Sequence, residues 1–356
     1  MTSRRYVQRG GALIRRPAVL FVSWGAVAGR SAEIAAALGG SSVAIFPPIE
    51  GRRPPVLARY LLASIITVVI LLRTAPRALI VTNPPVLLGL IALAWSRLCH
   101  IPLALDSHPG SFGGQEDTTS ARLLPVHRFL ARRVTVSLVT SEYWVAVVRG
   151  WEGEALVLHE APGPWVPSSP DETGKSRPLV VFVTRFSPDE PVAAGLTAAA
   201  LLPAVDFAVT GPLGDLSPEL KAVAPPNVQF VGFLPAPSYR ALVARADIVL
   251  CLTTEPTSVM RSAYEAVYAG KVLVVSDWPL DRELFPDALL VANEPHSIAR
   301  GVEEALARQA ELSEQAAAAR RRQVARVEAQ LGELRRVLGV RADGGADAGT
   351  VPGPVQ

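Results

Sequence analysis

One segment of the sequence carries residue types and spacings suited to binding an anionic ligand. Residues 255–277, EPTSVMRSAYEAVYAGKVLVVSD, place Arg261 and Glu265 four residues apart. Thr257 and Ser258 are good N-caps, so we expect a helix to begin there, with its first N–H groups facing a diphosphate. Eight residues return to nearly the same helix face, so Glu265 would lie on the side of Thr257 and accept hydrogen bonds from two vicinal ribose hydroxyls.

The same spacing permits a simpler interpretation. Arg261 and Glu265 could form a surface ion pair, which contributes a few tenths of a kcal/mol to a helix. Geometry alone leaves both interpretations open.

A second candidate pair, Asp106 and His108, ends a predicted strand before the glycine-rich run PGSFGG. Histidine titrates near neutral pH, so His108 is a candidate base for an acceptor hydroxyl. Asp106 is either the base itself or the group that orients the imidazole. The alternative for His108 is a structural side chain bonded to backbone.

The loop WGAVAGRS follows the first predicted strand, and Gly25 and Gly29 flank it. Arg30 within this loop could add positive charge. A dinucleotide site is weakly supported, because the order G-x-G-x-x-G is absent.

No metal or cofactor is predicted. The pair D-x-D does not occur, and Cys99 and Cys251 lie in apolar surroundings without a partnering spacing.

Strand-like and helix-like segments alternate along most of the chain, which predicts two doubly wound, Rossmann-like α/β domains facing across a cleft. We expect a first domain at 1–162, a proline-rich linker at 163–177 and a second domain at 178–340 with one long C-terminal helix. Residues 341–356 are predicted to be disordered. Ligands of such sheets bind beyond the carboxyl ends of the strands.

The composition raises the question of a membrane, with 49% hydrophobic residues and a mean hydropathy of +0.29. The oiliest windows, 60–72 and 84–96, each hold 13 uncharged residues, fewer than the roughly 20 that a span needs. We read the N-terminus as a leader before the first strand and expect a cytoplasmic protein.

Basic residues cluster near the two oily windows and suggest a peripheral contact with an anionic membrane at its inner face. The cluster consists of Arg4, Arg5, Arg9, Arg15, Arg16, Arg52, Arg53 and Arg59. Nucleic acid fits less well, because aromatic residues make up 6% and do not alternate with the basic ones.

An ordered set of segments resembles GT-B glycosyltransferases of the family 4 type. In the C-terminal half these are VTRFSPDEP, DFAVTG, NVQFVGFL, YRALVARADIVLCLTT and the segment from Glu265 to Asp277. In the N-terminal half GRS, VTNPP, DSH and VTSEYW are similar to the chitobiosyldiphosphodolichol beta-mannosyltransferases, which mannosylate dolichol-linked chitobiose.

The resemblance implies metal-independent transfer of a hexose from a nucleoside diphosphate sugar to an acceptor hydroxyl, on a lipid-linked or cell-envelope glycan in polysaccharide biosynthesis. It implies that Glu265 holds the donor ribose, that the backbone near Phe233 and Leu234 meets the base, and that Arg185 faces the diphosphate. The expected donor contacts are Arg185, Gly211, Phe233, Leu234, Thr257, Ser258, Arg261 and Glu265. The resemblance also implies that the two domains form the GT-B arrangement, with the acceptor side at 1–162 and the nucleotide-sugar-binding side at 178–340. It implies that the loop between Gly25 and Gly29 borders the acceptor and lets the diphosphate pass closely, and Arg30 could add positive charge there.

Two positions depart from the family pattern. Thr257 stands where the family has a glutamate, and Glu190 stands where it has a lysine. These departures motivate an alternative function, a non-catalytic GT-B partner subunit of a glycosyltransferase complex. An epimerase acting on a nucleotide sugar is a third option with less support.

Overall fold

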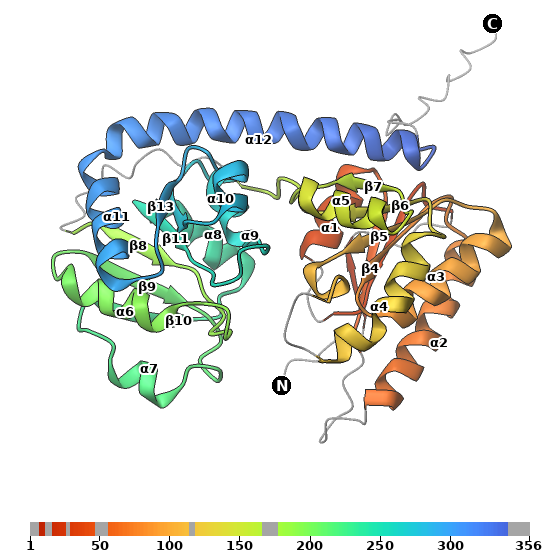
Figure 1. The fold of residues 1–356 in the computed structure, drawn as a ribbon, viewed down its shortest axis with the longest axis horizontal. Helices are drawn as coiled ribbons and strands as arrows, with labels where there is room; N and C mark the ends of the chain where they lie inside the picture. Colours follow the sequence, from red (N-terminus) through yellow and green to blue (C-terminus); the bar gives the residue numbers. More distant parts are fainter. Residues whose placement is uncertain are drawn as a thin grey trace, which may run out of the picture. The chain divides into compact units, whose positions relative to one another are not determined.

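The computed structural model describes residues 7–10, 16–25, 29–46, 56–113, 118–165 and 177–340. The chain divides into two compact units (Figure 1). The first unit comprises Met1–Ala161 and Ala329–Gln356, and the second comprises Pro162–Glu328. Most of the predicted linker, 166–176, and the predicted disordered tail, 341–356, lie outside the described residues.

The first unit contains a seven-stranded sheet of order β1-β3-β2-β4-β5-β6-β7. Its parallel strands are β2 (Leu20–Ser23), β3 (Ser41–Ile45), β4 (Leu79–Asn83), β5 (Leu103–Ser107), β6 (Val136–Val139) and β7 (Ala155–Val157). The predicted leader was wrong in one respect, because β1 (Val7–Gly10) pairs antiparallel with β3 at the edge of the sheet.

Three helices cover one face of this sheet. Successive strand side chains point to opposite faces, so alternate residues such as Leu20 and Val22 form a core with Leu71, Leu88 and Leu130 of these helices. The three helices are α2 (Val56–Thr74), α3 (Val86–Cys99) and α4 (Thr118–Ala131), which lie next to one another (Figure 1). The other elements are α1 (Gly29–Ala37), the short helix η1 (Pro109–Ser111) and α5 (Glu142–Gly150).

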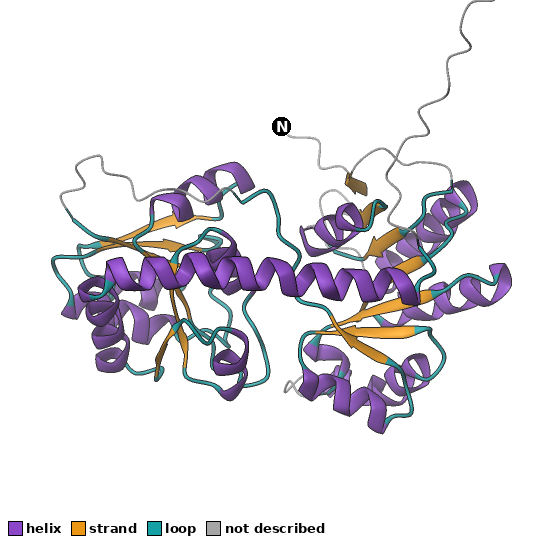
Figure 2. Cartoon of the chain, turned by 90° about the horizontal axis from the view of Figure 1, so that it is seen from above, coloured by secondary structure: helices purple, strands orange, loops and turns teal. Residues whose placement is uncertain are grey.

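The second unit contains a six-stranded, fully parallel sheet of order β10-β9-β8-β11-β12-β13. The strands are β8 (Leu179–Phe182), β9 (Asp206–Thr210), β10 (Val228–Gly232), β11 (Ile248–Cys251), β12 (Val272–Ser276) and β13 (Leu289–Val291). Val180 and Phe182 belong to the core on one face, and Val181 belongs to the core on the other. Helices therefore cover both faces, as Figure 2 shows for each sheet, and the predicted doubly wound α/β fold class is confirmed.

The helices of the second unit follow its strands in the expected alternation. They are α6 (Val192–Leu201), α7 (Pro218–Ala222), α8 (Ala236–Arg245), α9 (Arg261–Tyr268), α10 (Pro279–Leu284), α11 (Pro295–Ala307) and α12 (Gln309–Val337).

The C-terminal helix differs from the prediction in two ways. It is broken at Arg308, which ends α11 and pairs with Glu304 behind it and Glu311 ahead of it. In addition, residues from Ala329 onward group with the first unit, not with the predicted domain 178–340.

An apolar stripe at helical spacing near the end of α12 explains why these residues group with the first unit. Leu331, Leu334 and Leu338 are all buried. Arg335 donates a hydrogen bond to the carbonyl of Ala37, and Gln330 accepts one from the backbone of His159. The chain's last helix therefore completes the first unit.

Candidate functional site

The carboxyl ends of the parallel strands in the second unit meet at one edge of the sheet, where ligands of such folds bind. The loop after β8 and the loop after β11 are joined there by hydrogen bonds. The carbonyl of Asp189 accepts from the backbone N–H of Thr254 at 2.8 Å and from the hydroxyl of Thr253 at 3.2 Å. The two loops therefore form one connected rim.

Arg185 lies exposed on this rim, in a turn that Glu190 holds in place. One carboxylate oxygen of Glu190 accepts from the backbone N–H groups of Arg185 at 2.8 Å and of Ser187 at 3.0 Å. Burial raises the pKa of Glu190 above its usual value, against the effect of these two hydrogen bonds. The residue that departs from the family pattern thus shapes the loop that presents Arg185.

Gly211 follows β9 with φ of +132° and donates its N–H to the carbonyl of Gly232. A Cβ atom at Gly211 would lie 2.6 Å from the ring of Phe186. The ring itself packs edge-on against Phe230, with centroids 6.1 Å apart. The need for glycine at this position comes from the close approach of Phe186 at the base of the rim.

Phe233 and Leu234 follow β10 at the same edge of the sheet. Phe233 is 64% exposed, which is unusual for a large aromatic side chain, and Leu234 is half-buried. Gly232 precedes them with φ of +77°, a left-handed conformation that favours glycine.

The start of α9 corrects the prediction at Thr257 and Ser258. The helix begins at Arg261 after Met260, and the preceding residues form a turn instead. Ser258 donates its N–H to the carbonyl of Glu255, and the N–H of Glu255 bonds the hydroxyl of Thr253. Such local hydrogen bonds of serine and threonine compete with helix formation. Thr257 therefore does not share a helix face with Glu265.

The ion pair between Arg261 and Glu265 is present. Arg261 Nε lies 2.9 Å from Glu265 Oε1, and the two side chains are 33% and 18% exposed. Glu265 faces the phenol of Tyr239, whose pKa is raised well above its usual value by burial and by the negative charge of Glu265. The carboxylate thus lies in a partly buried polar cluster with Arg261 and Tyr239.

Cys251, the last residue of β11, lies near Glu265. Burial raises the pKa of its thiol to about 12, and the nearby charge of Glu265 acts in the same direction. Cys251 is therefore a neutral core side chain beside the polar cluster.

In the first unit, Arg30 joins two carboxylates. Its guanidinium binds Asp106 through contacts of 3.0 and 3.1 Å and Glu160 through one of 2.8 Å, and it also donates to the carbonyl of Leu158. Arg30 is 8% exposed. The prediction that Arg30 adds charge for a passing diphosphate was wrong, because ion pairs with Asp106 and Glu160 already neutralise its charge in the interior.

Asp106 is fixed as a carboxylate by the same contacts. Burial alone would raise its pKa, but Arg30 and His108 outweigh burial and hold the pKa well below its usual range. An acid that ionises so readily accepts a proton poorly, and Asp106 is 2% exposed. Its burial and its ion pair therefore favour the other option, in which Asp106 orients the imidazole of His108.

The remaining option, orientation of His108, fits the geometry. His108 Nε2 lies 3.5 Å from Asp106 Oδ2, and the imidazole is 44% exposed. The backbone N–H of His108 bonds the carbonyl of Asn83, which ties the end of β5 to the end of β4. Gly25 lies in a bend after β2 and Gly29 begins α1, while residues 26–28 between them lie outside the described residues.

A cavity of about 210 Å³ lies at the carboxyl edge of the first sheet. Trp24, Phe46, Arg59, Tyr60 and Pro84 contribute to its lining. The rings of Trp24 and Tyr60 lie 5.6 Å apart, and the guanidinium of Arg59 lies over Phe46 at 5.5 Å. The cavity combines aromatic faces with one positive charge.

The sequence reasoning missed this cavity and the role of Glu160. A signal was available for each, because Trp24 follows β2 directly, Pro84 follows β4 directly, and Glu160 follows the segment of β7. All three lie just beyond the carboxyl ends of strands, where functional side chains of α/β sheets gather.

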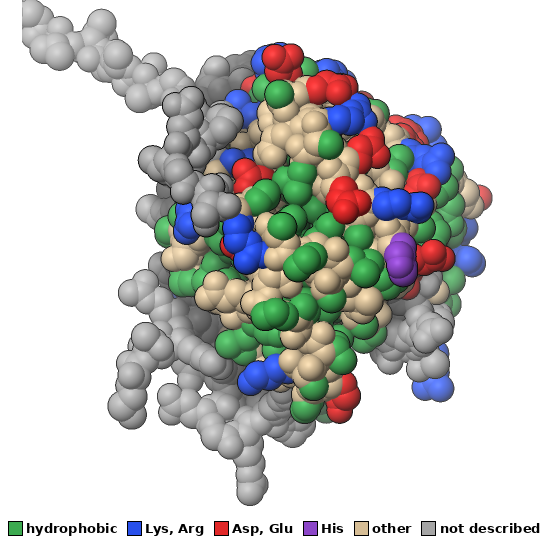
Figure 3. Space-filling view, turned by 90° about the vertical axis from the view of Figure 1, so that its left-hand side faces the viewer, with side chains coloured by type: hydrophobic (Ala, Val, Ile, Leu, Met, Phe, Trp, Pro, Cys, Tyr) green, Lys and Arg blue, Asp and Glu red, His purple; other side chains and the backbone are tan. Residues whose placement is uncertain are grey.

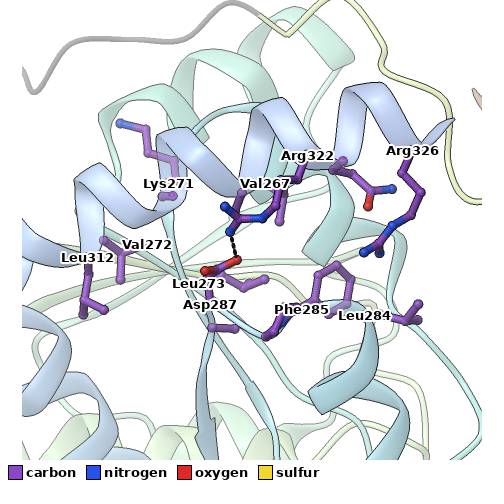
Figure 4. A pocket seen from close by; sticks show the side chains of 15 residues that line it. Val267, Lys271, Val272, Leu273, Leu284, Phe285, Asp287, Leu312, Arg322 and Arg326 are labelled. Carbon is purple, nitrogen blue, oxygen red and sulfur yellow. Dashed lines mark hydrogen bonds and ion pairs between the residues drawn. The ribbon is translucent and has the colours of Figure 1, made fainter. Parts of the chain in front are cut away.

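Another pocket lies in the second unit, between α12 and the amino end of β12 (Figure 4). Leu273, Leu312 and Arg322 line it, and Arg322 forms an ion pair with Asp287. It lies at the opposite end of β12 from the rim, so it serves the packing of α12 and is separate from the candidate donor site. Among the residues that the structure describes, no three His, Cys, Asp or Glu side chains gather as metal ligands would.

Comparisons with known proteins add to this geometry. A family model described as "Glycosyl transferase-like" matches residues 194–330. No curated protein matches the chain in sequence. The narrower resemblance to family 4 and to the chitobiose mannosyltransferases stays a prediction.

Solved structures match over nearly their whole length. Sucrose-phosphate synthase from Thermosynechococcus elongatus gives a TM-score of 0.67 at 16% identity, covering 91% of this chain and 99% of that one. HepE from Anabaena in complex with UDP-glucose gives 0.68 at 17%, covering 90% and 99%. An α,α-trehalose-phosphate synthase (UDP-forming) from Burkholderia vietnamiensis gives 0.59 at 12%, covering 90% and 99%. Two doubly wound sheets in one chain, matched from end to end by such structures, show that this protein has the GT-B fold.

Proposed function

We propose that the protein is a glycosyltransferase that moves a hexose from a nucleoside diphosphate sugar to an acceptor hydroxyl. The observation that carries the proposal is the polar cluster of Arg261, Glu265 and Tyr239 near the carboxyl edge of the second sheet. The matching family model, residues 194–330, includes these three residues.

The proposed donor contacts follow from the chemistry of the side chains in this cluster and on the rim of the second sheet. A carboxylate such as Glu265 accepts hydrogen bonds from the vicinal hydroxyls of a ribose, and the exposed ring of Phe233 offers an apolar face to the base. The guanidinium groups of Arg185 and Arg261 suit a diphosphate, because charge-assisted hydrogen bonds stabilise the negative charge that grows on the leaving group. The UDP-glucose bound by HepE makes uridine diphosphate sugars the first donors to test.

On the acceptor side, His108 is the proposed base, oriented by Asp106. The cavity beside Trp24 and Tyr60 is the proposed place for part of the acceptor, since aromatic faces bind sugar rings and apolar chains alike. We propose a lipid-linked or cell-envelope glycan as the acceptor, a cytoplasmic location, and transfer without a metal ion, because the sequence has no D-x-D pair.

A second function, a non-catalytic partner subunit, is favoured by one observation. Glu190, which replaces the family's lysine, uses a carboxylate oxygen to hold the turn of Arg185. A subunit of this kind would bind no nucleotide sugar and would co-purify with an active companion.

The test is release of nucleoside diphosphate from UDP-, GDP- and dTDP-hexoses, with and without added acceptor glycans. We expect release from one donor, unchanged by EDTA. His108→Gln should reduce release by about 10²-fold or more, the usual contribution of a positioned base, while donor binding persists. No release and no binding with any donor would favour the partner subunit.

A further inference from the structure

The helical layer of the first unit has an outer face that the donor chemistry does not use. We propose that α2, α3 and α4 form a docking surface for an anionic lipid bilayer, with α2 lying in the plane of the membrane. The proposal rests on these helices and not on the arginine cluster predicted near the N-terminus, because Arg4, Arg5, Arg15, Arg52 and Arg53 lie outside the described residues and the side chain of Arg9 is not described.

The outer face of α2 is apolar along nearly its whole length. Its large exposed side chains recur every three or four residues and therefore form one continuous stripe. They are Val56, Leu57, Leu61, Leu62, Ile65, Val68, Val69 and Leu72. Leu57 is 80% exposed and Leu72 is 65% exposed. Scattered apolar residues are normal on a surface, but a continuous stripe of this kind marks an interaction site.

The opposite face of α2 explains why the helix lies on a bilayer and does not cross it. By length and composition its 19 residues could span a membrane. However, Ala63, Ile70 and Leu71 pack into the core of the first sheet, and Thr67 accepts a hydrogen bond from Trp24. A spanning helix would have to abandon this core. Lying in the interface buries the outer stripe and keeps the inner one.

The charge of the layer favours an anionic partner. No Asp or Glu occurs between Glu50 and Asp106, or within the sequence of α4. The exposed charges on the three helices are Arg73 of α2, Arg97 of α3 and Arg122 and Arg128 of α4, and Arg132 and Arg133 follow directly. Figure 3, by contrast, shows a face of the molecule where acidic and basic side chains are interspersed. A surface that combines an apolar stripe with charges of one sign is complementary to anionic lipid headgroups.

Two further features fit the membrane interface. Phe129 of α4 is 44% exposed and lies under the guanidinium of Arg133 at 5.4 Å, and Leu98 at the end of α3 is 74% exposed. Long basic side chains beside apolar ones can bury their stems while their charges reach the headgroups. A soluble protein or a second copy of this chain would also match this charge if it presented an acidic, apolar face. The experiment below therefore distinguishes both from a lipid bilayer.

The proposal stands apart from the donor assignment, since no residue of the second unit takes part. It does bear on the acceptor, because Arg59 and Tyr60 of α2 line the aromatic cavity. A docked α2 would bring that cavity next to the lipid.

The experiment is flotation of the full chain with vesicles of phosphatidylcholine alone or mixed with phosphatidylglycerol. We expect the wild type to float with the mixed vesicles and to be released by high salt. The double change Leu57→Asp and Leu61→Asp should weaken binding about tenfold or more, since two buried leucines are lost. Arg73→Glu should weaken it about fivefold or more, as expected for removing and reversing one charge at the surface.

Val223→Asp is the matched control, because Val223 is 60% exposed in the second unit and should leave flotation unchanged. Unchanged melting temperatures of the variants show that they fold. The proposal is overturned if the wild type stays with the soluble fraction at low salt, or if the Leu57 and Leu61 changes leave flotation intact. It is also overturned if the wild type forms a dimer that the same changes disrupt and no vesicle binding occurs.

Discussion

Arg30, Asp106 and Glu160 show how a single buried cation organises the acceptor side. The guanidinium neutralises two carboxylates from the ends of different strands, and one of these carboxylates reaches His108. The arrangement leaves His108 as the exposed titratable group while its support is buried. Pairs of this kind gain specificity of geometry more than net stability.

Removing the charge of Asp106 tests this arrangement. Asp106→Asn should lower the free energy of unfolding by about 3–5 kcal/mol at neutral pH, because Arg30 loses a buried partner. The pKa of Asp106 is lowered in the folded state, so its contribution is complete above the unfolded pKa of about 3.9 and is lost only at lower pH. Urea unfolding at pH 7 measures the loss, with the exposed Asp215→Asn as control; equal stability of both variants would contradict the account.

Asp281 is a buried carboxyl with the opposite behaviour. Burial raises its pKa to about 7, and its Oδ2 atom lacks a hydrogen-bond partner among the described residues. Between pH 4 and 7 the folded state holds a proton that the unfolded state has released, so the free energy of unfolding falls as pH rises through this window.

Asp281→Asn should remove that decline. The wild type should lose about 2–3 kcal/mol more than the variant between pH 5 and pH 8. Urea unfolding at the two pH values gives both numbers. Parallel losses in the two proteins would show that Asp281 is ionised in the folded state.

Residue types near strand ends suggest candidate site residues from the sequence, but they do not reveal the partners of those residues. His108, Glu265 and Arg185 could be chosen because histidine, carboxylate and guanidinium groups beyond strands suggest binding. The burial of Arg30 could not be predicted, because its two partners lie 76 and 130 residues away in the sequence and meet it only in the folded sheet.

At the scale of elements, the alternation of strands and helices was predictable because buried parallel strands read as short Val, Ile and Leu runs. The boundaries of the elements were less predictable. The start of α9 was placed at Thr257 because threonine is a good N-cap, but hydrogen bonds within the turn 253–258 delay the helix to Arg261. The break at Arg308, where the backbone leaves the helical conformation with φ of −108°, is likewise not revealed by periodicity.

The rim of the second sheet depends on Gly211. Gly211→Ala should lower the free energy of unfolding by about 1–3 kcal/mol, because the new Cβ would lie 2.6 Å from Phe186 and the backbone has φ of +132°. Gly214→Ala is the matched control, since a Cβ there meets open space and should change stability by less than about 0.5 kcal/mol. Thermal unfolding compares the two; an equal effect would mean that Phe186 moves aside freely.

At the scale of the whole molecule, two units of similar construction divide the proposed work. The second unit carries the polar cluster of Glu265, which is the proposed nucleotide site, and the first carries His108, the aromatic cavity and the proposed membrane face. The division was visible in the sequence as two runs of alternating elements. The return of the last helix to the first unit was not, because the stripe of Leu331, Leu334 and Leu338 does not say which sheet it covers.

The central claim is that a nucleoside diphosphate sugar binds at the polar cluster of Arg261, Glu265 and Tyr239. The matched control is Glu304→Ala, which removes another ion pair of four-residue spacing, with Arg308 on α11. Both variants should melt within a few degrees of the wild type without ligand, since such pairs contribute little.

The most direct measurement is the melting temperature with and without UDP-, GDP- or dTDP-sugars. A ligand at 100 times its Kd stabilises the folded protein by about 2.7 kcal/mol, which is readily seen as a rise in melting temperature. We predict that one sugar nucleotide raises the melting temperature of the wild type and of Glu304→Ala, and that Glu265→Ala abolishes the rise. A full rise in Glu265→Ala, or unfolding of that variant without ligand, would contradict the account and leave Glu265 as a structural partner of Arg261.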